Sequence, residues 1–189
     1  MSADNSESLI LIWRIAELHA RKLLAEKIEP HHLLLALTKC VDLDLITLVP
    51  KDTPNHDELL EQLLREVRRI RTVFRVADFD ARTFRRRLRK VAPEARFAVD
   101  DHETLHRSKA TKKLFMEAQQ FAELSGQVVY PVHLLLALLF AQDQFSDEVM
   151  RELGVDRKRL QEIAKREIFT TKATGFSLGG EAKRGRGRN

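Results

Sequence analysis

The hexapeptide HLLLAL occurs twice in this chain of 189 residues, at His32–Leu37 and again 101 residues later at His133–Leu138. Six identical residues at a fixed offset are typical of an internal duplication, even in a sequence rich in Leu and Ala. The match continues upstream, where the residues two and four positions before each histidine also correspond. These are Pro30 and Pro131, and Ile28 and Val129. The sequence therefore predicts two copies of one structural unit.

Each copy begins with the pattern of an amphipathic helix, over about 7–25 and 108–125. Alanines four residues apart lie on this helix in both copies, and their small side chains would let another helix approach closely. They are Ala16 and Ala20, and Ala118 and Ala122. The Leu-rich helix that follows each proline is apolar nearly all round, so we expect it to be the most buried.

Two more helices complete each copy. A short third helix is predicted over about 42–48 and 145–153. The fourth helix is expected to begin at Thr53-Pro54 in the first copy and at Asp156 in the second, because these residues are good helix caps. No stretch of the sequence convincingly predicts a sheet.

The fold class that we expect is all-α, with two pseudo-symmetric four-helix repeats forming one compact domain. The first repeat would cover about 6–70, an Arg-rich connecting insert about 71–106, and the second repeat about 107–168. Residues 171–189 are rich in Gly, Lys and Arg, so we expect a disordered basic tail there. The chain has only seven glycines and five prolines, the residues that most often form turns and end helices. This low number favours helices over strands.

Composition excludes several classes of protein. With 43% hydrophobic and 32% charged residues, the chain has the balance of a globular protein rather than a disordered one. Its longest apolar run, Leu134–Ala141, is too short to span a membrane. The polar, acidic N-terminus does not look like a secretory signal, and a single cysteine, Cys40, cannot form an internal disulfide. We therefore expect a cytoplasmic protein.

The order of these features resembles the Clp N-terminal domain, which precedes the ATPase modules of the Clp/heat-shock unfoldases. The resemblance rests on the alanine pairs, the proline before HLLLAL, and the Leu-Gly-Val-Asp segment at Leu153–Asp156 ahead of a closing helix. The stretch Ile28–Leu33 is similar to the disaggregase branch of the family, and Tyr130–Leu134 is closely related to it.

The resemblance implies a non-catalytic domain that recognises substrate or adaptor polypeptides for a Clp-type ATP-dependent unfoldase or protease. The sequence has no G-x-x-x-x-G-K-[ST] phosphate loop, so we expect no nucleotide or other cofactor and no ATP hydrolysis by this chain. The protein would then be either a free-standing recognition domain or one that acts together with a separate Clp-type ATPase.

The resemblance also places a ligand groove between the two copies. Its lining residues would be Ser6, His31, Ser108 and Val132. In the branch of the family that binds phosphorylated arginine, a Thr-Glu pair occupies the positions of Pro30-His31 and Pro131-Val132. Neither His nor Val can make the bidentate contact of a carboxylate with a guanidinium, so we do not expect phosphoarginine recognition.

The two motif histidines, His32 and His133, admit a structural or a metal-binding interpretation. Their equivalent positions in the two copies favour a structural role at the start of a buried helix. Zinc would need three or four convergent ligands, and none is spaced for it. A histidine acting as a general base has no recognisable nucleophile beside it, so we expect neither a metal site nor an enzyme.

Positive charge is concentrated in residues 65–90, which hold ten Arg and one Lys against three acidic residues. Asp80 is expected to cap a helix over Ala81–Val91, and Pro93 to stop it. The candidate basic patch on this helix is Arg82, Arg85, Arg86, Arg87, Arg89 and Lys90. Three interpretations stay open: a solvated face whose Arg stems cover apolar surface, a site for an acidic protein partner, and a nucleic-acid site shared with the tail.

Overall fold

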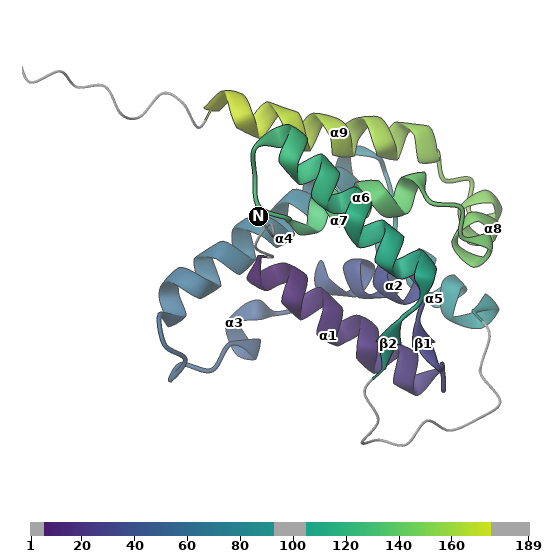
Figure 1. Cartoon of the computed structure of the whole chain (residues 1–189), viewed down its shortest axis with the longest axis horizontal. Coiled ribbons are helices and arrows are strands. Elements are labelled where there is room, and N and C mark those ends of the chain that lie inside the picture. The colour runs from purple at the N-terminus through teal and green to yellow at the C-terminus, as the bar shows by residue number, and fades with distance from the viewer. Residues whose placement is uncertain (1–5, 93–104, 175–189) are drawn as a thin grey trace, which may run out of the picture.

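The computed structural model describes residues 6–92 and 105–174, with side chains described up to residue 170 (Figure 1). The helices of the first half are α1 (Glu7–Lys22), α2 (Pro30–Cys40), α3 (Leu45–Leu48), α4 (His56–Val76) and α5 (Ala81–Val91). Those of the second half are α6 (Lys109–Ser125), α7 (Pro131–Phe140), α8 (Gln144–Glu152) and α9 (Arg157–Thr174). Two-residue strands, β1 (Lys27–Ile28) and β2 (His106–Arg107), form a parallel pair.

The all-α fold and the duplication predicted from the sequence are confirmed. Helices α1 to α4 correspond in order to α6 to α9, and α5 is an addition to the first half. The two HLLLAL helices, α2 and α7, lie in the interior of the bundle, and nearly all of their side chains are buried (Figure 1). None of the helices in the described ranges is both long and apolar enough to cross a membrane.

The paired alanines act as the sequence predicted. All four have no exposed surface, and α1 packs on α2 while α6 packs on α7. Because a methyl side chain leaves the helix backbone uncovered, each first helix can lie close against its Leu-rich neighbour. This packing forms part of one hydrophobic core that both halves share.

Some element ends differ from the prediction. Helix α4 begins at His56 rather than at Thr53-Pro54, after Asn55 in the left-handed conformation (φ 55°). It continues to Val76, into the segment predicted as insert. Helix α9 continues to Thr174, so residues 171–174 are helical; the rest of the predicted tail, and Pro93, lie outside the described residues.

The turn after the first helix of each copy has the same geometry but not the same residue. Leu24 in the first copy and Gly126 in the second both adopt the left-handed conformation, at φ 53° and φ 67°. The next residue, Ala25 or Gln127, donates its N–H back to the second alanine of the pair, at 2.9 Å in both copies. Only the second copy uses glycine, the residue that adopts this conformation without strain.

The two copies are interlocked through their backbones. The N–H of Ser108, just before α6, donates to the carbonyl of Ile28 in β1 at 3.2 Å. The N–H of Ser6, just before α1, donates to the carbonyl of Val129 at the same distance. The start of each first helix is therefore docked on the segment that precedes the other copy's Leu-rich helix. The sequence did not predict the β1–β2 pair, which belongs to this docking.

Candidate functional site

The four residues expected to line a groove are all buried. Their exposed fractions are 4% for Ser6, 3% for His31, 7% for Ser108 and 1% for Val132. Ser6 and Ser108 lie at the docking contacts just described, and His31 contacts Phe145 of the second copy. They are not on an open surface that a ligand could reach without movement of the chain.

Two of these side chains make contacts that explain their burial. The Ser108 hydroxyl accepts from the N–H of Thr111 at 3.1 Å, and the Thr111 hydroxyl donates to the Ile28 carbonyl at 2.7 Å. The His31 ring packs edge-on against Phe145, with ring centroids 5.4 Å apart. The Ser6 hydroxyl is buried without a hydrogen-bond partner.

His32 and His133 hold the start of their helices in the same way. The Nδ1 atom of His32 accepts from the backbone N–H of Glu29 at 3.0 Å, and that of His133 from Tyr130 at 2.9 Å. An accepting Nδ1 requires the neutral ring with its proton on Nε2. Nε2 of His133 lies 3.3 Å from the hydroxyl of Ser125, which accepts a hydrogen bond from the Nε2–H group.

Burial keeps both rings neutral. It lowers the pKa of His32 to about 3, with the neighbouring His31 as the next cause. It lowers the pKa of His133 to about 4, assisted by the positive charge of Arg69. Within the described parts of the chain, no three His, Cys, Asp or Glu side chains lie in a group that could hold a metal ion. These contacts give both histidines a structural role.

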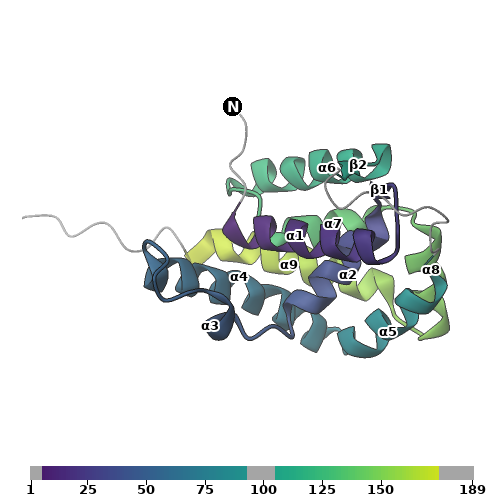
Figure 2. The ribbon, with the colours of Figure 1, turned by 90° about the horizontal axis from the view of Figure 1, so that it is seen from below.

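An open cavity lies instead between α1 and α6, the two equivalent first helices. It has a volume of about 260 Å³ and is lined by Leu9, Ile10 and Trp13 of α1, Arg107 of β2 and Phe115 of α6. Ile10 is 45% exposed at its edge. In Figure 2, α6 runs along one side of α1, and β2 leads into the start of α6.

The aromatic pair in this cavity crosses the boundary between the copies. Trp13 and Phe115 meet edge to face, with centroids 5.9 Å apart. The Arg107 guanidinium lies over both rings, 5.6 Å from the first and 5.5 Å from the second. Such a site offers apolar and aromatic walls with one positive charge at the rim.

The sequence contains a signal for this pair, although neither residue was among the predicted site residues. The offset of 102 that relates the alanine pairs also relates Trp13 to Phe115, so both copies carry an aromatic residue at the same position of the first helix. In the structure these two equivalent residues contact each other across the boundary between the copies. Arg107 lies outside the predicted basic patch, and nothing in the sequence pattern indicated that it would lie beside this pair.

Comparison with known proteins identifies the architecture. No protein-family model matches the sequence, and no curated protein matches it. Among solved structures, the chain is similar to the Hsp104 N-terminal domain from Candida albicans, with a TM-score of 0.59 at 18% identity over 85% of this chain and 89% of that one. The N-terminal domain of the caseinolytic protease-associated chaperone ClpD from Arabidopsis thaliana matches at TM-score 0.50 and 17% identity, over 87% and 94%. The chain has the Clp N-terminal domain fold.

A further match extends the likeness. A chain from a malarial protein secretion system gives a TM-score of 0.63 at 19% identity, over 88% of this chain and 96% of that one. All three structures are nearly covered by this chain, so the Clp N-terminal fold accounts for both copies together. Identities below one in five mean that the likeness extends to the fold and not to individual side chains.

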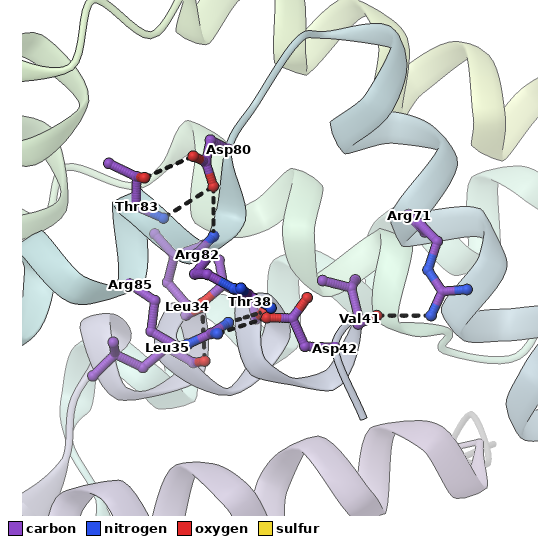
Figure 3. Close-up of polar contacts among 10 residues, drawn as sticks. All are labelled: Leu34, Leu35, Thr38, Val41, Asp42, Arg71, Asp80, Arg82, Thr83 and Arg85. Atoms are coloured by element: carbon purple, nitrogen blue, oxygen red, sulfur yellow. Dashed lines mark hydrogen bonds and ion pairs between the residues drawn. The ribbon is translucent and has the colours of Figure 1, made fainter. Parts of the chain in front are cut away.

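Within this Clp N-terminal fold, part of the predicted basic patch is structural. Arg85 of α5 is only 8% exposed; its guanidinium donates to the Thr38 carbonyl and pairs with Asp42 at 2.6 Å (Figure 3). Cations at the carboxyl end of a helix satisfy its unpaired carbonyls and favour its dipole. Arg85 therefore caps α2 and is not available to a partner.

The second copy has the same device from a different element. Arg157, at the start of α9, donates to the carbonyls of Leu139 and Ala141 at the end of α7 and pairs with Asp147. Both buried Leu-rich helices thus end on an arginine that also holds a carboxylate. The extra helix α5 provides the capping arginine of α2, as α9 provides that of α7.

Of the other predicted patch residues, Arg87 also has a partner inside the protein. Its guanidinium makes two bonds to Glu152 of α8, at 2.5 and 2.8 Å, and so ties α5 to the second copy. The remaining four are exposed. They are Arg82, Arg86, Arg89 and Lys90. The patch is therefore smaller than the sequence predicted.

Proposed function

We propose that this chain is a non-catalytic recognition domain that binds segments of substrate or adaptor polypeptides for a Clp-type ATP-dependent unfoldase or protease. The observation that carries the proposal is the α1–α6 cavity, an open aromatic site on a fold shared with N-terminal domains of chaperones. The described part of the chain would need no cofactor for this role.

The cavity suits one kind of ligand. Its size matches one or two apolar side chains, and Trp13 and Phe115 offer ring faces and edges to them. Such side chains are exposed in an unfolded or extended segment and hidden in a folded protein. The cavity can therefore distinguish unfolded segments from folded proteins by their exposed apolar side chains, without requiring one particular sequence.

Charge at the rim adds a second preference. Arg107 forms no ion pair with any described carboxylate, and α6 opens with Lys109 and Lys112 and no acidic residue in its first turn. The next lysine, Lys113, pairs with Glu117 on the same helix. Positive charges beside an apolar pocket favour ligands that carry Asp or Glu next to the apolar anchor. We infer that the preferred segments are apolar with acidic neighbours.

The test compares one unfolded protein with its folded form. Fluorescein-labelled α-lactalbumin, either native or reduced and carboxymethylated, is titrated with the domain, and the dissociation constants are measured by anisotropy. We expect binding of the unfolded form only. Ile10→Glu, at the cavity edge, should weaken that binding at least tenfold, because a charge replaces an apolar wall.

The matched control is Ile46→Glu, the same substitution at a 65% exposed position on α3, outside the cavity. We expect it to bind like the unchanged protein. Equal affinity for native and unfolded ligand, or equal losses in the two variants, would contradict the proposal.

A further inference from the structure

A second hollow lies where the end of α4 meets the start of α5. It has a volume of about 510 Å³, and three arginine side chains, Arg71, Arg75 and Arg82, line it. In Figure 2, α5 and α6 lie on opposite sides of the molecule, with α1 and α2 between them. The arginine hollow is therefore separate from the α1–α6 cavity.

The carboxylates in this hollow are engaged within the protein. Asp42 pairs with Arg85 at 2.6 Å (Figure 3). Asp80 caps α5: it accepts from the N–H groups of Arg82 and Thr83 and from the Thr83 hydroxyl. Hydrogen bonds from Thr83 hold the pKa of Asp80 below its usual range, so it stays charged and bound to the helix start.

The arginines that line the hollow are less engaged. One nitrogen of Arg71 donates to the Val41 carbonyl at 2.7 Å, which leaves the other N–H groups of this five-donor side chain. Arg75 and Arg82 are exposed, and neither side chain forms an ion pair within the described residues. The hollow therefore carries positive charge that the fold does not neutralise.

The residues that line the hollow favour an acidic polypeptide over a nucleic acid as the ligand. Its aromatic residues, Phe74 and Phe79, are only 4% and 8% exposed and pack on each other with centroids 4.7 Å apart. No ring face is therefore left on which a base could stack. An acidic polypeptide needs no such stacking surface, because its carboxylates pair directly with guanidinium groups.

We propose that the hollow formed by Arg71, Arg75 and Arg82 is a docking site for an acidic segment of a partner polypeptide, distinct from the α1–α6 cavity. Guanidinium groups bind carboxylates in bidentate pairs, and three of them around one hollow suit two or three Asp or Glu side chains. A partner bound here leaves the cavity on the other side free for substrate. This gives the exposed part of the Arg-rich segment a function that its structural members, Arg85 and Arg87, do not have.

The test uses the full chain and four labelled probes: a Glu-rich peptide, the same peptide with Gln at every Glu, and single- and double-stranded DNA of matched length. Binding is measured by anisotropy at two salt concentrations. We expect binding of the Glu peptide alone. Arg75→Glu with Arg82→Glu should weaken it at least tenfold, and Arg75→Gln with Arg82→Gln at least threefold.

The control pair, Arg14→Glu with Lys158→Glu, changes the net charge equally at exposed positions outside the hollow. It should weaken binding less than twofold, and circular dichroism should show all variants folded. The proposal is overturned if both charge-reversed pairs lose affinity equally, if the Glu peptide does not bind, or if DNA binds more tightly and loses affinity through Arg75 and Arg82.

Discussion

Mild acid should destabilise this domain because His32 and His133 cannot take up protons while the chain is folded. In the unfolded chain their pKa is 6.5, and in the folded protein it is about 3 and about 4. The folded values are the lower ones, so the stabilisation is complete above pH 6.5 and is lost as the pH falls toward the folded values. At pH 5.5 the loss is about 1.4 kcal/mol for each histidine, or about 3 kcal/mol for the pair.

Asparagine is the variant that isolates this effect. In the double variant His32→Asn with His133→Asn, each asparagine oxygen can accept the backbone hydrogen bond that Nδ1 accepted. Unlike histidine, the asparagine side chain does not titrate near neutral pH. His19, whose pKa burial also lowers to about 4, contributes to both proteins and cancels in the comparison. The difference between the two proteins therefore reports the pair.

The measurement is urea unfolding followed by circular dichroism at pH 8.0 and pH 5.5. The unchanged protein should lose about 3 kcal/mol more than the double variant between these two values. If both proteins lose the same free energy of unfolding, the histidines are not held neutral by burial and the assigned structural role is wrong.

Two further predictions concern stability, both measured by urea unfolding at pH 7.5. Arg85→Met should cost about 2 kcal/mol, because it leaves the buried Thr38 carbonyl without a donor and the partly exposed Asp42 carboxylate without its partner. The exposed Arg86→Met on the same helix should change stability by less than about 0.5 kcal/mol, and similar losses in the two would contradict the capping role. Leu24→Gly should stabilise the domain by about 0.5 kcal/mol by relieving a left-handed turn, while Gly126→Ala should destabilise it by about 1 kcal/mol. Effects of the same sign at these two equivalent positions would show that the turn is not strained.

The sequence predicted the parts of the fold that depend on repetition. The duplicated HLLLAL segment and the alanine pairs recur at nearly one offset, and the structure places both copies of each in equivalent, buried positions. Burial of this kind leaves a strong pattern, because nearly every residue of α2 and α7 must be compatible with a crowded interior. Asp156 was likewise identified correctly as the cap of α9, where it accepts from the N–H of Arg159 at 3.0 Å.

The site was harder to predict because it depends on what two distant segments bring together. Trp13 and Phe115 are ordinary residues of two amphipathic helices, and only the pseudo-symmetric arrangement makes them neighbours. The strand pair has two residues on each side, too few for an alternating pattern. Arg85 could not be separated from its exposed neighbours in sequence, since its role depends on carbonyls 47 residues away.

The α1–α6 cavity is the central claim, and Trp13 allows it to be observed directly because it is the only tryptophan in the chain. In a nitrogen-15 correlation spectrum of the labelled domain, its indole N–H gives a single resonance. On titration with an unstructured peptide rich in leucine and glutamate, this resonance should shift together with amides of α1 and of the first turns of α6, while those of α3 and α8 stay in place. An indole signal that does not move when other amides shift, or a spectrum that does not change at all, would contradict the account.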